Sequence, residues 1–191
     1  MDTNIIIPKG YPYEGKHLEE IISPDLVQER VSEIGREISQ KYIDKVPIII
    51  GVLNGAFLFM ADLVRNLSIQ FEVDFIKIDS YGDNTKSSGT VRLLKDISAD
   101  ITGRDVLVVE DIVDTGLSLN FLKHRMEEAS PKSLSFVTCL YKPNVASGDL
   151  SIDWVGFNID DHYVVGYGLD LKQIYRGLPG IYAVSKELNQ K

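Results

Sequence analysis

Three carboxylates and two hydroxyls crowd the short segment VLVVEDIVDTGLS. Glu110 and Asp111 follow an apolar run, and Asp114 comes three residues later, directly before Thr115 and close to Ser118. Acids this close together repel one another, and the crowding costs free energy unless a cation or a substrate hydroxyl relieves it. The residue types therefore predict a site that binds Mg²⁺ or a polar substrate.

The turn DTGLS adds groups that can bind a phosphate. It brings backbone N–H groups, the hydroxyls of Thr115 and Ser118, and the N-terminus of the next helix to one place. The structural alternative is that Asp114 or Thr115 only caps that helix. A cap accounts for one acid and leaves Glu110 and Asp111 crowded without a compensating charge. On these grounds two interpretations stay open, a Mg²⁺ and phosphate site or a structural turn.

The apolar pattern around this segment predicts strands that alternate with helices. Helical spacing runs over residues 24–45, AFLFMADLVRNL and SLNFLKHRMEEA. The expected strands are Ile48–Leu53, 71–78, 91–94, 106–109, SLSFVTCLY, WVGFNI and YVVGYG. This alternation predicts an α/β fold with a central, mostly parallel, twisted sheet flanked by helices on both faces. Ligands of such sheets bind beyond the carboxyl ends of the strands, where the acidic segment lies.

Length and composition are those of one globular domain. The chain has 191 residues, 44% of them hydrophobic, so a single domain over residues 1–191 is expected. The 20 basic and 28 acidic residues give a net charge of -8, which favours neither nucleic acid nor a membrane surface as a partner. The lone Cys139 has apolar neighbours and is expected to be a buried hydrophobe. The sequence shows no signal peptide and no apolar run of membrane-spanning length, so we expect a cytoplasmic protein.

Four ordered motifs resemble the phosphoribosyltransferases that bind 5-phosphoribosyl 1-pyrophosphate, and among them the bacterial-type hypoxanthine (hypoxanthine-guanine) phosphoribosyltransferases. The similar segments are IIIGVLNGAFLFMADL, SYGDNTKSSGTVRLLKD, DITGRDVLVVEDIVDTG and VGFNIDDHYVVGYGLDLKQIYRGLP. The resemblance implies the type I phosphoribosyltransferase fold. Its core would span about residues 24–149, under a small hood made by about residues 1–23 and 150–191.

The resemblance also implies roles for the acidic segment. Glu110 and Asp111 would lie near the ribose hydroxyls of the donor and help to position Mg²⁺, which prefers hard oxygen ligands. Asp114 would lie beside purine N7 and act as the general base. The 5-phosphate would be held by backbone N–H groups and hydroxyls of the next loop, made of Asp114, Thr115, Gly116, Leu117 and Ser118.

Two further motifs imply contacts to the leaving group and a lid. The pyrophosphate would be bound by Leu53, Asn54 and Gly55 together with Arg176. Taken alone, LNG would be an ordinary strand-to-helix turn, and Arg176 would form a surface ion pair of little energetic value. Ser80 and Tyr81 begin the loop that would close over the reacting centre and exclude water from a cationic sugar intermediate.

The implied purine-side residues are Lys142, Tyr163, Val164 and Asp170. Lys142 would donate to the oxygen at purine position six, Tyr163 would stack on the ring, and Val164 would contact the base edge through its backbone. Asp170 would reach a second Mg²⁺ that bridges the pyrophosphate. Taken alone, Lys142 would be a solvated surface charge and YVVGYG a core strand.

The chain departs from the pattern of this family in two places. The stretch FNIDDHY stands where many members read closer to FEIPDKF, so Tyr163 keeps the stacking face and adds a hydroxyl that needs a partner. Leu117 replaces a lysine of some relatives, with little loss expected because the phosphate contacts there are largely backbone. His162 receives no role.

The activity that the resemblance implies is purine salvage. The enzyme would use Mg²⁺ and move the 5-phosphoribosyl group to N9 of hypoxanthine or guanine, giving inosine or guanosine monophosphate and pyrophosphate. The alternatives are a nucleotide-sensing regulatory module, which the acidic charge disfavours, and an enzyme that prefers xanthine. A homodimer or homotetramer is expected, because members of the family commonly form them.

Overall fold

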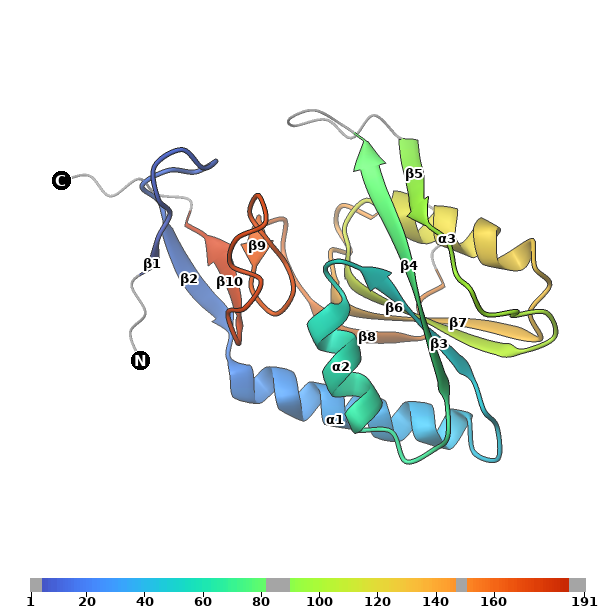
Figure 1. Cartoon of the computed structure of the whole chain (residues 1–191). Helices are drawn as coiled ribbons and strands as arrows, with labels where there is room; N and C mark the ends of the chain where they lie inside the picture. The colour runs from blue at the N-terminus through green and yellow to red at the C-terminus, as the bar shows by residue number, and fades with distance from the viewer. Residues whose placement is uncertain (1–4, 82–89, 147–150, 186–191) are drawn as a thin grey trace.

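The chain folds into a core sheet covered by helices, with a smaller sheet beside it (Figure 1). The computed structural model describes residues 5–81, 90–146 and 151–185, and of residues 80, 81 and 90 only the backbone. The core sheet has the strand order β5-β4-β3-β6-β7-β8. These strands are β3 (Ile48–Leu53), β4 (Glu72–Tyr81), β5 (Thr90–Lys95), β6 (Asp105–Val113), β7 (Ser133–Tyr141) and β8 (Trp154–Asn158).

The core sheet is parallel except at one edge, as the sequence predicts. The pairs β3–β4, β3–β6, β6–β7 and β7–β8 are parallel, and only β5 runs antiparallel to its neighbour β4. The central strand β3 has the predicted bounds and is buried from Ile48 to Val52, as expected for a parallel strand covered on both faces.

Helices cover both faces of this sheet. The helices α1 (Pro24–Lys41) and α2 (Phe57–Arg65) pack on one face and α3 (Leu117–Glu127) on the other. Ser23 caps α1 by accepting a hydrogen bond from the Leu26 N–H at 3.4 Å. The helix predicted over residues 24–45 ends at Lys41, because the chain turns there and Asp44 adopts a left-handed φ of 58°. Cys139 is buried in the core, as predicted.

Both ends of the chain build the second sheet, which we call the hood. Its strand order is β1 (Ile5–Ile6), β2 (His17–Ile22), β10 (Ile181–Val184) and β9 (Val164–Val165), and every pair is antiparallel. The hood has its own small apolar cluster, which includes Ile7, Leu18 and Val165. Residues far apart in the sequence are thus held side by side.

The predicted hood boundary at residue 150 is wrong, because β8 belongs to the core sheet. It pairs in parallel with β7, and Trp154 is 8% exposed beneath Lys41, whose Nζ lies 4.7 Å from the ring centroid. Arg30 of α1 donates to the carbonyls of Val155 and Gly156 at 2.9 and 3.2 Å. The apolar strand is therefore covered by α1, and the C-terminal part of the hood begins after Asn158.

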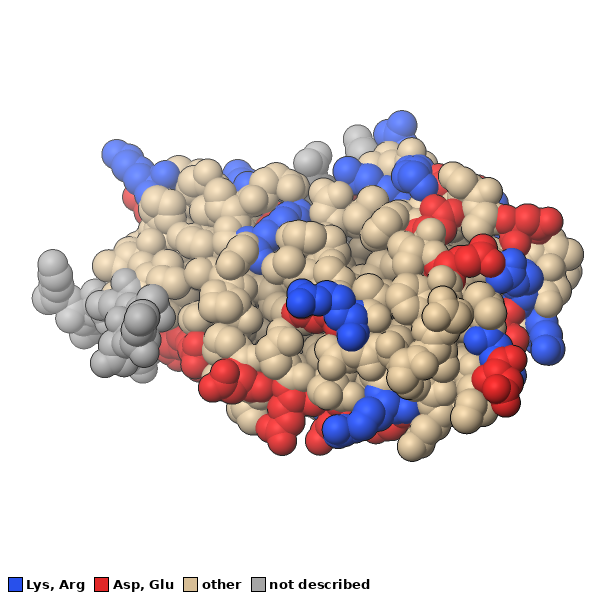
Figure 2. All heavy atoms as spheres, turned by 60° about the horizontal axis from the view of Figure 1, so that its bottom comes forward, with Lys and Arg blue, Asp and Glu red and all other residues tan. Residues whose placement is uncertain are grey.

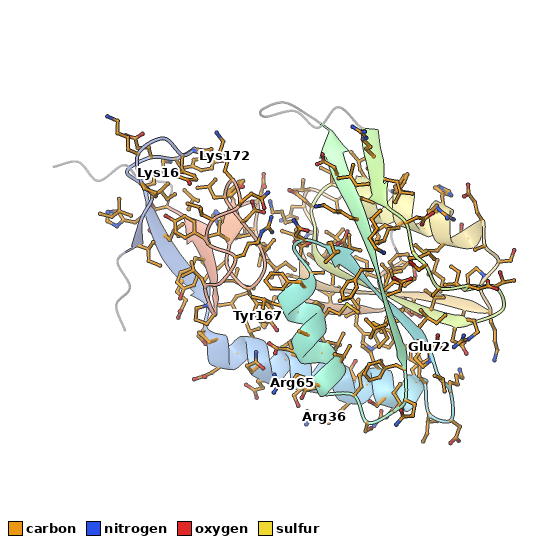
Figure 3. The ribbon with its side chains drawn as sticks, viewed as in Figure 1. Lys16, Arg36, Arg65, Glu72, Tyr167 and Lys172 are labelled. Atoms are coloured by element: carbon orange, nitrogen blue, oxygen red, sulfur yellow. The ribbon has the colours of Figure 1, made fainter. Side chains whose placement is uncertain are left out.

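The hood docks on the core through a loop that follows β9. Tyr167 lies between the hood and α2, and its hydroxyl donates to Oδ2 of Asp62 at 2.8 Å (Figure 3). Burial raises the pKa of Tyr167, so the hydroxyl keeps its proton and remains a donor. The next residue, Gly168, has a φ of 103°, and a Cβ there would collide with the Gly55 carbonyl. This contact holds the hood against the loop between β3 and α2.

Figure 2 shows basic and acidic side chains interspersed on one face of the molecule. Among the helices of the described residues, none is both long and apolar enough to cross a membrane.

Candidate active site

The acidic pair Glu110 and Asp111 lies within β6, although the sequence predicted a strand that ends at residue 109. Backbone pairing with β7 continues past the acids, through Glu110 with Thr138 to Val113 with Tyr141. Polar side chains do not end this strand, because the ladder uses only backbone groups. The two acids are therefore fixed by the sheet.

Burial sets the electrostatics of this pair. Glu110 is 4% exposed, and its burial, with the adjacent Asp111 charge, raises its pKa well above the ordinary value. Burial also raises the pKa of Asp111 to about 6, against the opposing effects of its backbone hydrogen bonds and of Arg176. Both acids are costly to keep ionised, and a bound cation would favour their charged forms.

The loop after β3 packs directly on Asp111. The peptide between Leu53 and Asn54 is cis, and a Cβ added at Gly55 would collide with the Asp111 carboxylate. Only a glycine allows this approach. The predicted pyrophosphate loop and the predicted acidic pair are thus in contact.

A cavity of about 460 Å³ opens above these residues and is called the donor cavity. Its walls come from the ends of β3 and β6, the loop before α3, and the hood. All the residues predicted to bind the phosphates, ribose and metal line it: Leu53, Asn54, Gly55, Glu110, Asp111, Asp114, Thr115, Gly116, Leu117, Ser118, Asp170 and Arg176.

The start of α3 resolves the alternative of a simple helix cap. Gly116 occupies the cap position with a left-handed φ of 87° and has no side chain that could make a capping bond. Thr115 accepts only a long bond of 3.5 Å from the Leu117 N–H, while Asp114 pairs with Lys142. The start of α3 therefore lines the donor cavity, and its first N–H groups meet the Thr115 side chain only through this long bond, which suits an anion site.

A second cavity of about 260 Å³, the base cavity, adjoins the first between core and hood. The residues predicted to contact the purine all line it: Lys142, Tyr163, Val164 and Asp170, together with Asp111 and Asp114. Lys142 follows β7, and its N–H donates to the Val113 carbonyl at 3.0 Å. This bond places the lysine beside Asp114, with an Nζ–Oδ2 distance of 3.3 Å.

A segment of the hood forms the outer wall of both cavities. Arg176 pairs with Asp170 at 2.7 Å and donates to the Gly168 carbonyl at 2.7 Å. The added hydroxyl of Tyr163 has the partner that the sequence required, because it donates to the Asp170 carbonyl at 2.9 Å. The Tyr163 ring also packs against Tyr13, with centroids 5.2 Å apart.

The carboxylates of the donor cavity fit a Mg²⁺ ion that is held partly by the protein and partly by water and substrate, and not one held by protein ligands alone. Within the described residues, no group of three or more His, Cys, Asp or Glu side chains is arranged to hold a metal ion. Glu110 and Asp111 were predicted to position one Mg²⁺ and Asp170 to reach a second, and the three do not form a ready-made cage; Asp170 is engaged by Arg176. Mg²⁺ commonly needs only one or two carboxylates, with water and substrate phosphates as its other ligands. Glu110 and Asp111 would provide the carboxylates.

The structure adds two residues that the sequence analysis left without a role. Asp161 pairs with Lys142 at 3.1 Å, and Tyr13 packs on Tyr163. Tyr13 lies far from Tyr163 in the sequence, so no local motif marked it, whereas Asp161 falls within the stretch FNIDDHY but received no role there. Of the predicted lid, Ser80 and Tyr81 end β4, and residues 82–89 lie outside the described part of the chain.

Comparison with known proteins agrees with this geometry. Residues 20–172 match the family described as "Phosphoribosyl transferase domain". The hypoxanthine-guanine phosphoribosyltransferase of Bacillus subtilis (strain 168) is 44% identical over 161 residues, which cover 84% of this chain and 89% of that one. The hypoxanthine phosphoribosyltransferase of Salmonella typhimurium is 42% identical over 167 residues, covering 86% and 94%.

Solved structures give the same result for the fold. The crystal structure of a hypoxanthine-guanine phosphoribosyltransferase from Bacillus anthracis superposes with a TM-score of 0.83 at 44% identity, covering 87% of this chain and 98% of that one. Sequence, fold and the two adjoining cavities lead to one conclusion: the chain belongs to the phosphoribosyltransferase family.

Proposed function

We propose that the protein transfers the 5-phosphoribosyl group of 5-phosphoribosyl 1-pyrophosphate to N9 of hypoxanthine or guanine. One observation carries the proposal. The donor cavity, with its helix N-terminus and acidic pair, adjoins a base cavity that contains the buried Lys142, and Asp114 lines both. A sugar phosphate and a 6-oxopurine would meet at this residue.

In the reaction, the bond from ribose C1 to pyrophosphate breaks and the bond from C1 to purine N9 forms. Asp114 accepts the proton that the purine ring loses, as a general base placed at the junction of the cavities. The carboxylates of Glu110 and Asp111 would lie beside the ribose and stabilise the positive charge of an oxocarbenium-like transition state. Arg176 would neutralise charge on the departing pyrophosphate.

The remaining groups orient the two substrates. The N–H groups of residues 115–118 would bind the 5-phosphate, Lys142 would donate to the purine 6-oxygen, and Tyr163 would stack on the ring. Mg²⁺, held by Glu110 and Asp111, would supply charge neutralisation at the donor phosphates. Asp170, on the wall shared by both cavities, would contribute to holding a second ion.

The relatives support this choice of substrates. The curated relatives are named as hypoxanthine or hypoxanthine-guanine phosphoribosyltransferases, at 42 to 44% identity over most of both chains. A 6-oxopurine is also the base type that a buried ammonium donor suits, because its oxygen accepts a hydrogen bond where the amine of adenine cannot.

The test is nucleotide formation from the donor with hypoxanthine, guanine, xanthine and adenine in parallel, each with and without Mg²⁺. We expect Mg²⁺-dependent turnover of hypoxanthine or guanine, and a Lys142→Ala variant that loses at least about tenfold in kcat/KM for these bases. Preference for xanthine would change the proposed substrate. Nucleotide binding without turnover of any base would favour a regulatory module instead.

A further inference from the structure

Lys142 is held by two carboxylates from different parts of the molecule. Its side chain is 7% exposed, and its Nζ lies 3.3 Å from Oδ2 of Asp114 and 3.1 Å from Oδ1 of Asp161. Asp114 belongs to the core loop before α3, whereas Asp161 belongs to the turn that leads from β8 into the hood. The ammonium therefore stands at the seam between core and hood.

The backbone fixes Asp161 in this place. The Ile159 N–H donates to the Tyr141 carbonyl at 2.9 Å, which ties the turn to the residue before Lys142. Within the turn, the His162 N–H donates to the Asp160 carbonyl at 2.8 Å. The position of Asp161 thus follows from the end of β7, the same strand that positions Lys142.

A buried lysine with Asp114 as its sole partner would conflict with the proposed chemistry. A buried ammonium needs a compensating charge, and it would draw Asp114 into a closed ion pair. With Asp114 as its one anchor, the ammonium would be drawn toward that carboxylate, and nothing would hold its other two donors in a fixed direction toward the purine oxygen. Asp161 offers a second anion, and its side chain is 72% exposed.

We propose that Asp161 is a positioning residue for 6-oxopurine recognition, which holds Lys142 away from a closed pair with Asp114. An ammonium has three donors, and with Asp114 and Asp161 each taking one, the third is free for the oxygen at purine position six. The inference rests on the proposed function and adds to it a residue of the hood that acts through Lys142. Surface ion pairs usually contribute little free energy, but here the Lys142 partner is buried, and the pair sets the direction of its remaining N–H donor.

The test compares Asp161→Asn with Asp160→Asn in the full chain. Both variants remove one negative charge from the same exposed turn and keep the side-chain shape, but of the two only Asp161 pairs with Lys142. Asp161→Glu serves as the conservative variant. Calorimetric titration measures binding of inosine 5′-monophosphate, which has the 6-oxygen, and of purine riboside 5′-monophosphate, which lacks it.

We expect Asp161→Asn to weaken binding of inosine monophosphate about tenfold and binding of the nucleotide without the 6-oxygen by less than about twofold. The KM for hypoxanthine should rise by a similar factor while the KM for the donor stays constant. Asp160→Asn should match the wild type, and Asp161→Glu should recover part of the loss.

Two results would overturn the inference. Asp161→Asn that behaves like Asp160→Asn would show that Lys142 needs no second anion. Equal loss for both nucleotides would show that Asp161 acts on the loop as a whole and not through the 6-oxygen. A wild-type chain that binds neither nucleotide and forms no product would instead refute the proposed function, and this inference with it.

Discussion

The donor cavity and the base cavity share Asp111, Ile112, Asp114 and Asp170 but are built in different ways. The donor cavity is made mainly by loops at the ends of β3 and β6, two adjacent strands of the core sheet. The base cavity takes roughly half of its lining from the hood, including Tyr163 and Val164. Donor binding should therefore depend on the sheet, and base binding on how the hood docks.

Substitution of Asp114, which lines both cavities, should give the largest loss of activity. An Asp114→Asn variant keeps the shape of the side chain but cannot accept the purine proton. We expect turnover to fall by roughly 10²- to 10⁴-fold, while the KM for the donor changes little. Steady-state kinetics with hypoxanthine and Mg²⁺ measures both. Comparable losses in turnover and donor binding would contradict the assignment of Asp114 as base.

Gly55 tests the donor cavity alone. In Gly55→Ala the new Cβ would collide with the partly buried Asp111 carboxylate, which cannot move without disturbing the strand. We expect the KM for the donor to rise at least about tenfold, with a smaller change in the KM for hypoxanthine. Gly177→Ala is the control in the hood, because a Cβ there would meet nothing within 4 Å. Equal effects on both substrates would mean that the cavities are not separable.

The contrast between the donor cavity and the base cavity also explains which site residues could be predicted from the sequence. Leu53, Asn54 and Gly55 follow one strand, and residues 110–118 form one continuous stretch, so local patterns and the resemblance located them. Tyr13 joins the base site only through the hood, in which β2 pairs with β10 although the two strands lie near opposite ends of the sequence, and Asp161 is placed by the hydrogen bond from Ile159 to the end of β7. The two-residue strands of the hood carry too few residues for a period-2 signal. Long-range pairing, not local propensity, positions them.

The length of β6 illustrates the same limit within the core. Apolar residues predicted a strand that ends at residue 109, but the backbone ladder continues to Val113. The acids Glu110 and Asp111 break the apolar pattern because they serve the site. Local rules therefore fail at a site where one buried acid and one partly buried acid are kept side by side at a cost in stability.

The raised pKa of Asp111 predicts a pH dependence of stability in the metal-free protein. The carboxyl titrates at about 6 in the folded chain and near its ordinary value of 3.8 in the unfolded chain. Between these values the folded state binds more protons, so this group's contribution to stability falls as pH rises from about 4 to 6 and is flat above about 7.

Thermal melts with a chelator at pH 5 and pH 7.5 measure this contribution. We expect the wild type, relative to Asp111→Asn, to lose roughly 2–6 °C more in Tm at the higher pH, because only the wild type must ionise this desolvated carboxyl. Mg²⁺ with the donor should reduce the difference at pH 7.5 by favouring the charged form. Identical pH profiles for the two proteins would contradict the desolvation of Asp111.

Tyr163 tests the base cavity with the smallest change. Tyr163→Phe keeps the stacking ring and the packing against Tyr13 but removes the hydroxyl that donates to the Asp170 carbonyl. A neutral hydrogen bond between partly exposed groups contributes about 1 kcal/mol, so we expect the KM for hypoxanthine to rise roughly two- to fivefold. The KM for the donor should rise less, because the ion pair of Asp170 with Arg176 remains. Equal weakening of donor and base binding would mean that the Tyr163 hydroxyl holds the hood segment that walls both cavities. Both cavities would then depend on the hood to the same extent.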